Sequence, residues 1–268
     1  MALSYTLDDY DLEAFVSVAR SFARDRYGYV VTPNVDHFIR YHDDAAFRAR
    51  YADAEFILLD SRFLSHLFRV VKRLRLGVCT GSDLTARLFE QVIESNDEIV
   101  LIGGSDAQAQ ILAQRYELKG LKHYNPPMNF VSDPAEVERC VEFVEANSPF
   151  RFCFLAVGAP QQELLAQLLK SRGKARGMAL CIGASIDFLT GKETRAPSWM
   201  QKIGCEWLFR LLNNPKRLAK RYLVRGPRVF LLLWMTQLRV RPRPAVRTAA
   251  ALTATGGLRV RGYAGPTE

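Results

Sequence analysis

The sequence predicts an α/β fold: a mainly parallel, Rossmann-like sheet flanked by helices, followed by a basic helical C-terminal appendage. Between residues 28 and 185, short apolar runs alternate with longer amphipathic segments, the rhythm of βαβ units. At residue 196 the strand-like runs stop. Residues 207–267 hold 13 Lys and Arg and no Asp or Glu, so this part of the chain is expected to meet a polyanion.

The predicted strands are short apolar runs rich in β-branched and aromatic residues. In chain order they are 28–34, 55–60, 76–81, 98–104, 150–158 and 178–185. Most of the intervening segments are long enough for a helix, so consecutive strands can run parallel.

One helix is predicted closely, from residue 134. Asp133 is a suitable N-cap, Pro134 suits the first helical position, and Glu136 completes a capping box. The apolar stripe that would pack on the sheet consists of Val137, Cys140, Val141 and Val144.

The chain divides by composition into a body at 1–195, a membrane-associating appendage at 196–240 and a tail at 241–268. The appendage is predicted to form two or three helices, one of which has Asn214 as its N-cap and Pro215 at its first position. The tail has the Pro, Gly, Ala and Thr content of a segment that need not fold. The apolar run 229–235 is too short for a bilayer span, which needs about 20 residues, so it is expected to lie on a membrane.

Composition excludes several classes of protein. With 49% hydrophobic and 24% charged residues, the chain is neither disordered nor fibrous. The five cysteines are scattered without a CxxC pair, which indicates buried, reduced thiols rather than a zinc site. The acidic N-terminus lacks the apolar run of a signal peptide, and the protein is expected to stay in the cytosol.

Ligands of open parallel sheets bind at the carboxyl ends of the strands, so the residues after each run are the candidate site. They are polar or small. They comprise Thr32, Pro33 and Asn34; Asp60 and Ser61; Thr80, Gly81, Ser82 and Asp83; Gly103, Gly104 and Ser105; Gly158, Pro160, Gln162 and Glu163; and Ser185 with Asp187.

Two turns, TGSDL at 80–84 and GGSDA at 103–107, could leave backbone N–H groups free for a phosphate. Neither is a GxGxxG, and the chain has no GxxxxGK[ST], so the dinucleotide and P-loop fingerprints are missing. Glycines that merely make strand-to-helix turns remain the alternative.

Asp60 ends a predicted strand and would present a carboxylate at the sheet edge, as a general base requires. Capping the next helix is its alternative role. Asp9 and Asp11 form a DxD that follows no apolar strand, and the four histidines lack metal-ligand spacing. No metal site is predicted.

The basic segment has a periodic arrangement of arginines. Arg217 and Arg221 are i, i+4 neighbours, Arg225 lies a turn further on, and Arg210 precedes them. A solvated face is the plain explanation, but the missing acids favour phosphate or anionic lipid as partner. Aromatic side chains typical of a membrane-interface belt interleave: Trp199, Trp207, Tyr222 and Trp234.

Several of these segments together resemble the signature blocks of the WecG/TagA/CpsF glycosyltransferases. The resemblance runs from about residue 28 to 235. The blocks are TPNVDHF (32–38), the strand end at Asp60, TGSDL (80–84), VGAPQQE (157–163), CIGASIDFLTGKETRAPSWM (181–200) and GCEWLFRLLNNPKRLAKRYLV (204–224).

The resemblance implies an inverting transferase that moves a sugar from a nucleotide sugar to a polyprenyl-diphosphate-linked acceptor, without cofactor or DxD metal. Asp60 matches the catalytic base and Thr32 the threonine beside it. Pocket positions match Asn34, Gln162, Glu163 and Asp187, and the strand ends add Asp83, Gly103, Gly104, Gly158 and Pro160. The arginines expected to bind the lipid diphosphate are Arg210, Arg217, Arg221 and Arg225.

The expected location is the cytoplasmic face of the bacterial inner membrane, held peripherally on anionic lipid, with no nucleic acid as partner. The sequence does not predict the oligomeric state, and a homo-oligomer is one of the options. Ser61 and Asn129 stand where the family often has glycine, so the sugar does not carry over.

The first candidate is a xanthan-type β-1,4-glucosyltransferase using UDP-glucose. The second transfers N-acetylmannosamine or its uronic acid. Rivals from other classes are a nucleotide-binding oxidoreductase and a non-enzymatic protein that binds lipid or nucleic acid.

Overall fold

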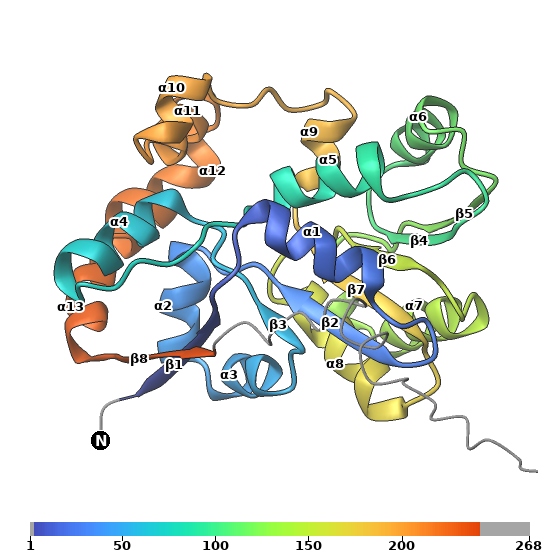
Figure 1. The fold of residues 1–268 in the computed structure, drawn as a ribbon, viewed down its shortest axis with the longest axis horizontal. Helices are drawn as coiled ribbons and strands as arrows, with labels where there is room; N and C mark the ends of the chain where they lie inside the picture. The colour runs from blue at the N-terminus through green and yellow to red at the C-terminus, as the bar shows by residue number, and fades with distance from the viewer. Residues whose placement is uncertain (1–2, 242–268) are drawn as a thin grey trace, which may run out of the picture.

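The structure, a computed structural model, describes residues 3–241 and contains a six-stranded parallel sheet (Figure 1). The strand order is β3-β2-β7-β6-β4-β5, and every pairing in it is parallel. A separate two-stranded sheet pairs β1 with β8. The strands are β1 (Ser4–Asp8), β2 (Tyr27–Val31), β3 (Phe56–Ile57), β4 (Glu98–Ile102), β5 (Gly120–Tyr124), β6 (Phe152–Leu155), β7 (Gly177–Cys181) and β8 (Gln237–Arg241). The predicted α/β class is confirmed.

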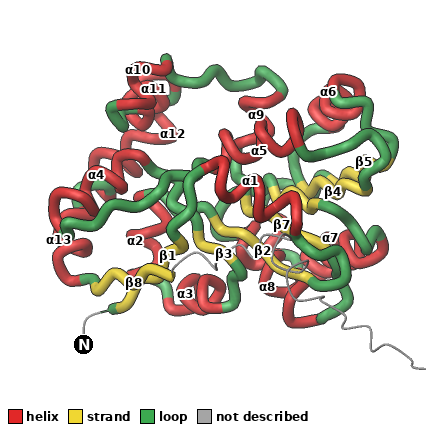
Figure 2. The backbone as a smooth tube through the Cα atoms, in the orientation of Figure 1, coloured by secondary structure: helices red, strands yellow, loops and turns green. Residues whose placement is uncertain are grey.

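Helices cover both faces of the large sheet (Figure 2). Apolar side chains of one face pack against α1 (Leu12–Ser21), α5 (Gly81–Gln91), α6 (Asp106–Arg115) and α9 (Ser185–Leu189). Those of the other face pack against α2 (Val35–Asp43), α3 (Ala45–Ala52), α7 (Pro134–Ala146) and α8 (Gln161–Arg172). Strand side chains alternate between the two cores, as Leu180 and Cys181 of β7 do.

A further group of helices lies beside the β3 edge of the sheet, at the left of Figure 1. The group consists of α4 (Arg62–Val71), α10 (Ser198–Lys202), α11 (Glu206–Asn213), α12 (Pro215–Ala219), the π-helical turn η2 (Lys220–Arg225) and α13 (Arg228–Met235). A 3-10 turn, η1 (Phe130–Ser132), precedes α7. Asn214 and Pro215 take the predicted cap and first positions of α12.

Most predicted strands are present, and one is wrong. The runs at 28–34, 98–104, 150–158 and 178–185 contain β2, β4, β6 and β7, whereas 55–60 contributes only the two residues of β3. The run at 76–81 is an extended loop that ends where α5 begins. Its backbone makes isolated hydrogen bonds rather than a strand ladder. Gly77 N–H donates to the Asp9 carboxylate (2.8 Å), and Cys79 N–H donates to Leu59 O (3.0 Å).

Three strands were not predicted, because each carries polar residues in sequence. β5 (GLKHY) is an edge strand, and β1 (SYTLD) and β8 (QLRVR) pair across almost the whole chain. Arg241 reinforces the last pairing with a bidentate ion pair to the buried Asp8 carboxylate (2.7 and 2.6 Å).

Helix α7 begins as predicted, but its capping box is absent. The Asp133 carboxylate accepts from Ala135 N–H (2.9 Å), and the apolar stripe faces the core. The Glu136 carboxylate instead accepts from the Tyr124 hydroxyl (2.7 Å) and Arg139 Nε (2.7 Å). The stronger hydrogen bonds to a charged partner and a neighbouring strand outcompete the helix's own amide.

The segment after residue 227 packs closely on the body. Val229 and Leu233 of α13 are fully buried in the main core, and Thr236 Oγ1 lies 2.7 Å from His42 Nε2 of α2. Residues 242–268, which form nearly all of the predicted tail, lie outside the described residues. The division of the chain at residue 196 stays a prediction.

Buried thiols were also expected. Cys79, Cys140, Cys153 and Cys181 are buried and unbridged, as predicted, while Cys205 is partly exposed.

Candidate active site

The segments after β2 and β3 meet at the carboxyl edge of the sheet. The two strands are neighbours, with Val31 opposite Ile57. Asp60 N–H donates to Pro33 O (3.0 Å), which fixes the two segments side by side. The structure therefore brings together the predicted residues Thr32, Asn34 and Asp60.

Asp60 is held by the amino end of α5. Its Oδ1 accepts from Gly81 N–H (2.7 Å), the first residue of that helix. Burial raises the pKa of the Asp60 carboxyl above its ordinary value, and the nearby Glu206 adds to the rise, while the Gly81 N–H, Arg210 and His37 oppose it. A carboxylate with a raised pKa is a stronger base, which suits proton abstraction.

Thr32 links two strands behind Asp60. Its hydroxyl donates to Cys181 O at the end of β7 (3.0 Å), and its side chain is almost fully buried. A Cβ at Gly81 would lie 3.1 Å from Thr32 Oγ1, so the start of α5 approaches the threonine closely. Thr32 thus fixes the spacing of β2, β7 and α5 around the carboxylate.

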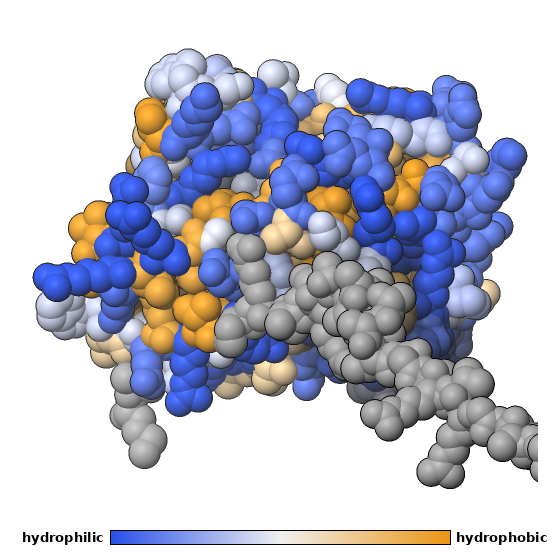
Figure 3. Space-filling model, in the orientation of Figure 1, coloured by the Kyte–Doolittle hydropathy of each residue, from blue (hydrophilic) through white to orange (hydrophobic). Residues whose placement is uncertain are grey.

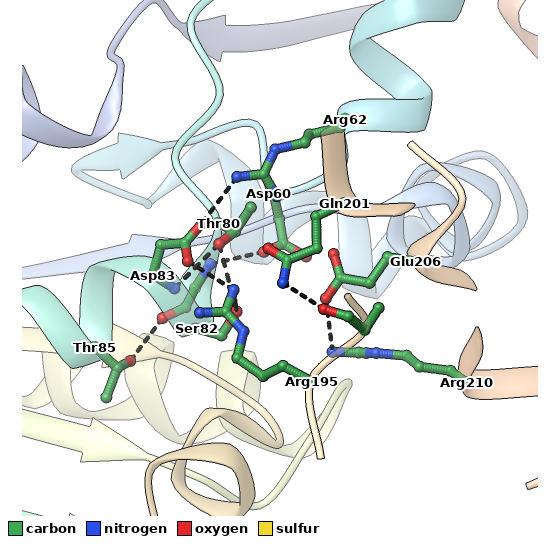
Figure 4. A network of polar contacts seen from close by, with 12 residues as sticks. Asp60, Arg62, Thr80, Ser82, Asp83, Thr85, Arg195, Gln201, Glu206 and Arg210 are labelled. Carbon is green, nitrogen blue, oxygen red and sulfur yellow. Dashed lines mark hydrogen bonds and ion pairs between the residues drawn. The ribbon is translucent and has the colours of Figure 1, made fainter. Parts of the chain in front are cut away.

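Asp83 is occupied by two arginines (Figure 4). Arg195 Nη2 lies 2.6 Å from one carboxylate oxygen and Arg62 Nη2 lies 3.1 Å from the other. Burial disfavours the ion, but the hydrogen bonds from Arg195 and Thr80 hold the pKa of Asp83 below its ordinary value. The Asp83 carboxylate therefore holds these two guanidinium groups in place near Asp60. The sequence did not indicate a role for either arginine, although Arg62 follows the candidate residues Asp60 and Ser61 and Arg195 lies within the block 181–200.

A cleft of about 440 Å³ opens from Asp60 toward the helices that follow residue 196. The body contributes Asp60, Thr80, Ser82 and Phe63. The helices beyond contribute Glu206, Trp207, Arg210, Arg221, Tyr222 and Phe230. The body thus contributes Asp60 and hydroxyl groups to the cleft, and the appendage contributes two arginines, Glu206 and most of the aromatic rings.

Aromatic rings line the appendage side of this cleft. Trp207 makes edge contacts with Phe63 and Tyr222, at centroid distances of 6.5 and 6.0 Å. Trp207 and Tyr222, which the sequence places in a predicted membrane-interface belt, both line the cleft, and their contact with a membrane stays a prediction. Trp199 and Trp234 are exposed at 63% and 76%.

A second group of predicted residues lies at the ends of β4, β6 and β7. Gly103, Gly104 and Gly158 all have positive φ (90°, 75° and 77°), which glycine adopts without strain. The Asp187 carboxylate accepts from Gln108 Nε2 (2.9 Å) and lies 3.2 Å from Lys192 Nζ. These residues do not line the cleft at Asp60.

Three pocket residues predicted at 160–163 have other surroundings. Gln162 and Glu163 are 2% and 0% exposed and do not line the cleft at Asp60, so their predicted place in a substrate pocket stays a prediction. They are buried because the first turn of α8 faces the sheet. Pro160 precedes that helix, and its carbonyl accepts from Arg50 Nη1 (3.2 Å).

The acidic N-terminal pair has structural contacts. The Asp9 carboxylate accepts from Gly77 N–H (2.8 Å), and the Asp11 carboxylate caps α1 at Ala14 N–H (2.9 Å). Across residues 3–241, no three His, Cys, Asp or Glu side chains gather in a way that could hold a metal ion.

A family model described as "Glycosyl transferase WecG/TagA/CpsF family" matches residues 1–243, which include every residue that the structure describes. The protein belongs to this family. It is therefore a glycosyltransferase, and the oxidoreductase and non-enzymatic rivals are set aside.

Of the four arginines expected to bind lipid diphosphate in this WecG/TagA/CpsF glycosyltransferase, two are found in the cleft. Arg210 and Arg221 line the cleft, with Arg210 Nη2 at 3.9 Å from Glu206 and Arg221 Nη2 at 3.3 Å from Asn34 Oδ1. Arg225 is exposed and is not among the residues that line the cleft, so the predicted cluster does not include it there. Arg217 belongs to α12, and its side chain lies outside the described part of the structure.

Proposed function

We propose that this glycosyltransferase inverts the anomeric centre of a nucleotide sugar, UDP-glucose being the first candidate, as it transfers the hexose to a polyprenyl-diphosphate-linked saccharide. The product would enter exopolysaccharide or surface polysaccharide. The observation that supports this most is Asp60, a partly buried aspartate with a raised pKa, in a cleft whose appendage side carries arginines and aromatic rings.

Asp60 is the proposed general base. Its Oδ1 is engaged by Gly81 N–H, and no hydrogen bond to Oδ2 occurs among the described residues. Oδ2 would take the proton of the acceptor hydroxyl as that oxygen attacks the anomeric carbon. The bond from this carbon to the nucleoside diphosphate breaks on the opposite side, which inverts the centre.

The diphosphates would be neutralised by protein cations and backbone dipoles. We assign Arg210 and Arg221 to the lipid diphosphate, because they line the cleft on the appendage side. The donor diphosphate would lie by Gly103, Gly104 and Gly158, where the glycine turns bring backbone close to the sheet edge. Charge neutralisation of this kind needs no metal ion.

Membrane docking is proposed through α13 and its neighbours. Phe230, Leu231, Trp234 and Met235 are each more than half exposed on one short helix. Val70 of α4 is exposed nearby, where Lys72 Nζ donates to Trp234 O (3.1 Å). Figure 3 shows hydrophobic surface on this side of the molecule, over α4 and α13.

Such a surface suits shallow insertion into the cytoplasmic leaflet of the inner membrane, with each nearby basic residue adding about 1 kcal/mol on anionic lipid. No helix within residues 3–241 is long and apolar enough to span a bilayer.

The donor and acceptor are tested by incubating the full chain with a panel of nucleotide sugars and a short-chain prenyl-diphosphate saccharide. Release of UDP from UDP-glucose that depends on the acceptor would support the first candidate. Turnover with UDP-N-acetylmannosamine or its uronic acid in its place would establish the second. Arg210→Ala should raise the KM for the acceptor about tenfold or more, the scale of a lost charge-assisted hydrogen bond, with donor KM unchanged.

Docking is tested by flotation with phosphatidylcholine vesicles containing phosphatidylglycerol. The double variant Phe230→Ser, Trp234→Ser should stay at the bottom of the gradient while the native chain floats. Met128→Ser is the matched control, because Met128 is 98% exposed on a loop elsewhere. Equal flotation of the native chain and the double variant would refute docking through α13. Substitution is preferable to truncation at residue 200, which would remove Val229 and Leu233 from the core.

A further inference from the structure

A buried chain of polar contacts runs from the end of β7 toward the cleft. Gly183 N–H donates to Gln162 Oε1 (2.8 Å), and Gln162 Nε2 donates to Glu163 Oε1 (2.9 Å). The same Glu163 oxygen lies 3.4 Å from His37 Nε2 on α2. Gln162, Glu163 and His37 are 2%, 0% and 8% exposed, and none of them lines the cleft. These three side chains therefore cannot touch a substrate that lies in it.

The second nitrogen of His37 continues the chain. His37 Nδ1 lies 2.9 Å from Asn34 Oδ1. That oxygen also caps α2 by accepting from the backbone N–H groups of Asp36 (3.1 Å) and His37 (3.4 Å). Because backbone N–H groups only donate, the Asn34 atom at this place is the amide oxygen, and His37 Nδ1 must carry a proton. An attractive contact between His37 Nε2 and the Glu163 carboxylate needs a second proton on Nε2, so the ring in this arrangement is the imidazolium.

The chain ends at an arginine of the appendage. Arg221 Nη2 donates to the same Asn34 Oδ1 (3.3 Å), and Arg221 Nε lies 3.6 Å from the Asp36 carboxylate. Both contacts join η2 to the first turn of α2. The orientation of one amide oxygen thus affects where an arginine of the cleft is held.

A carboxylate as deeply buried as Glu163 costs free energy unless it is paired and hydrogen-bonded. Gln162 and His37 are the groups that contact it here, and Gln162 is itself fixed by Gly183. This arrangement resembles the way in which a carboxylate orients a catalytic imidazole, except that this imidazole faces an amide rather than a substrate.

We propose that Glu163 and His37 are positioning residues: Glu163 orients the His37 ring, His37 Nδ1–H fixes the Asn34 amide oxygen, and that oxygen holds Arg221 and η2 against α2. The part of this proposal that concerns how η2 is held against α2 does not depend on which substrate the enzyme uses. Its consequence for the acceptor rests on the proposed function, in which Arg221 binds the lipid diphosphate.

Two isosteric variants separate the two faces of the imidazole. His37→Asn keeps a nitrogen donor near the place of Nδ1 and loses the contact with Glu163. His37→Gln reaches toward Glu163 and loses the donor to Asn34. The docking model expects His37→Asn to release η2 only partly, because the donor to Asn34 is kept although the contact with Glu163 is lost, and expects His37→Gln to release it further. Glu163→Gln, which keeps an oxygen, should be mild, and Glu163→Ala should also release η2.

Release is measured on the full chain by hydrogen exchange of the backbone amides of residues 220–226, which include Gly226 N–H bonded to Arg221 O (2.9 Å). Exchange should accelerate about tenfold in His37→Gln and Glu163→Ala, the scale of one lost hydrogen bond to a charged group. Arg221→Ala is the positive reference. Thermal unfolding of each variant shows whether the body is intact.

The acceptor KM is measured on the same variants. Faster exchange with a raised acceptor KM and an unchanged donor KM supports the positioning role and the acceptor assignment together. Faster exchange with an unchanged acceptor KM supports the positioning role and removes Arg221 from the acceptor site. Native exchange in folded His37→Gln and Glu163→Ala overturns the proposal, as does equal exchange in His37→Asn and His37→Gln.

If the His37 variants fail to fold, Asn34→Ser replaces them. Serine can still cap α2 but is too short to reach Arg221. Faster exchange at 220–226 supports the proposal, and native exchange overturns it.

Discussion

Asp60→Asn is the substitution that tests the proposed chemistry most directly. Asparagine has nearly the same shape as aspartate. Its Oδ1 can still accept from Gly81 N–H, which lies 2.7 Å from the Asp60 carboxylate in the native chain. The start of α5 should therefore stay in place while the basic group is lost. Loss of a general base lowers turnover by about 100-fold to 10,000-fold, and 100-fold corresponds to about 2.7 kcal/mol of transition-state free energy.

The same substitution should not destabilise the fold. Burial raises the pKa of Asp60 in the folded chain, so its ionised form is less favourable there than in the unfolded chain. The stability associated with the protonated group is fully present below the unfolded pKa and is lost as pH rises through the folded pKa. Asp60→Asn should thus unfold at the same temperature as the native chain, or higher, at neutral pH, with the gain vanishing in acid.

The assay combines acceptor-dependent UDP release, donor binding by calorimetry and thermal unfolding. Asp25→Asn is a matched control, because Asp25 is exposed just before β2, at the opposite end of the strand from the site. Turnover within about threefold of the native rate in a folded Asp60→Asn enzyme, far short of the loss expected for a base, would remove Asp60 from that role.

Three further outcomes are expected. Activity should survive EDTA, because the proposed mechanism neutralises the diphosphates with arginines and backbone N–H groups rather than with a metal, and loss of activity on chelation that Mg²⁺ restores would contradict this. Glu206→Gln should shift the acid limb of the kcat/KM profile to lower pH, because Glu206 contributes to the raised pKa of Asp60; an upward shift would show that the two carboxylates do not interact in this way. Arg241→Ala should lower the free energy of unfolding in urea by about 1–3 kcal/mol by leaving the buried Asp8 without its cation, whereas Arg239→Ala, on an exposed position of β8, should change it little.

The sequence predicted those parts of the fold whose signal is local. β2, β4, β6 and β7 are buried on both faces and read as continuous apolar runs. β1 and β8 show no such run, because each is stabilised by the other across the whole chain. The run at 76–81 is apolar and partly buried, but its backbone pairs with no strand among residues 3–241.

For the site, the rule of strand ends correctly brought Thr32, Asn34 and Asp60 together. It could not distinguish residues that line the cleft from fully buried residues such as Gln162 and Glu163. That distinction depends on which way the first turn of α8 is rotated against the sheet. The arginines on Asp83 were missed for a related reason, since an ion pair between distant segments leaves no periodic pattern.

The pairing of β1 with β8 makes the C-terminal helices a loop attached at both ends rather than a free arm. The chain leaves the body near Arg195, which is bonded to Asp83 (2.6 Å), and returns at Thr236 beside His42. Helices α11 and η2 could separate from the cleft while both attachments hold. Their return would then be an intramolecular event at a high local concentration, with a small loop-closure entropy. Any separation of the wall from the cleft is therefore limited by the length of chain between the two attachments, which keeps the wall in the neighbourhood of Asp60.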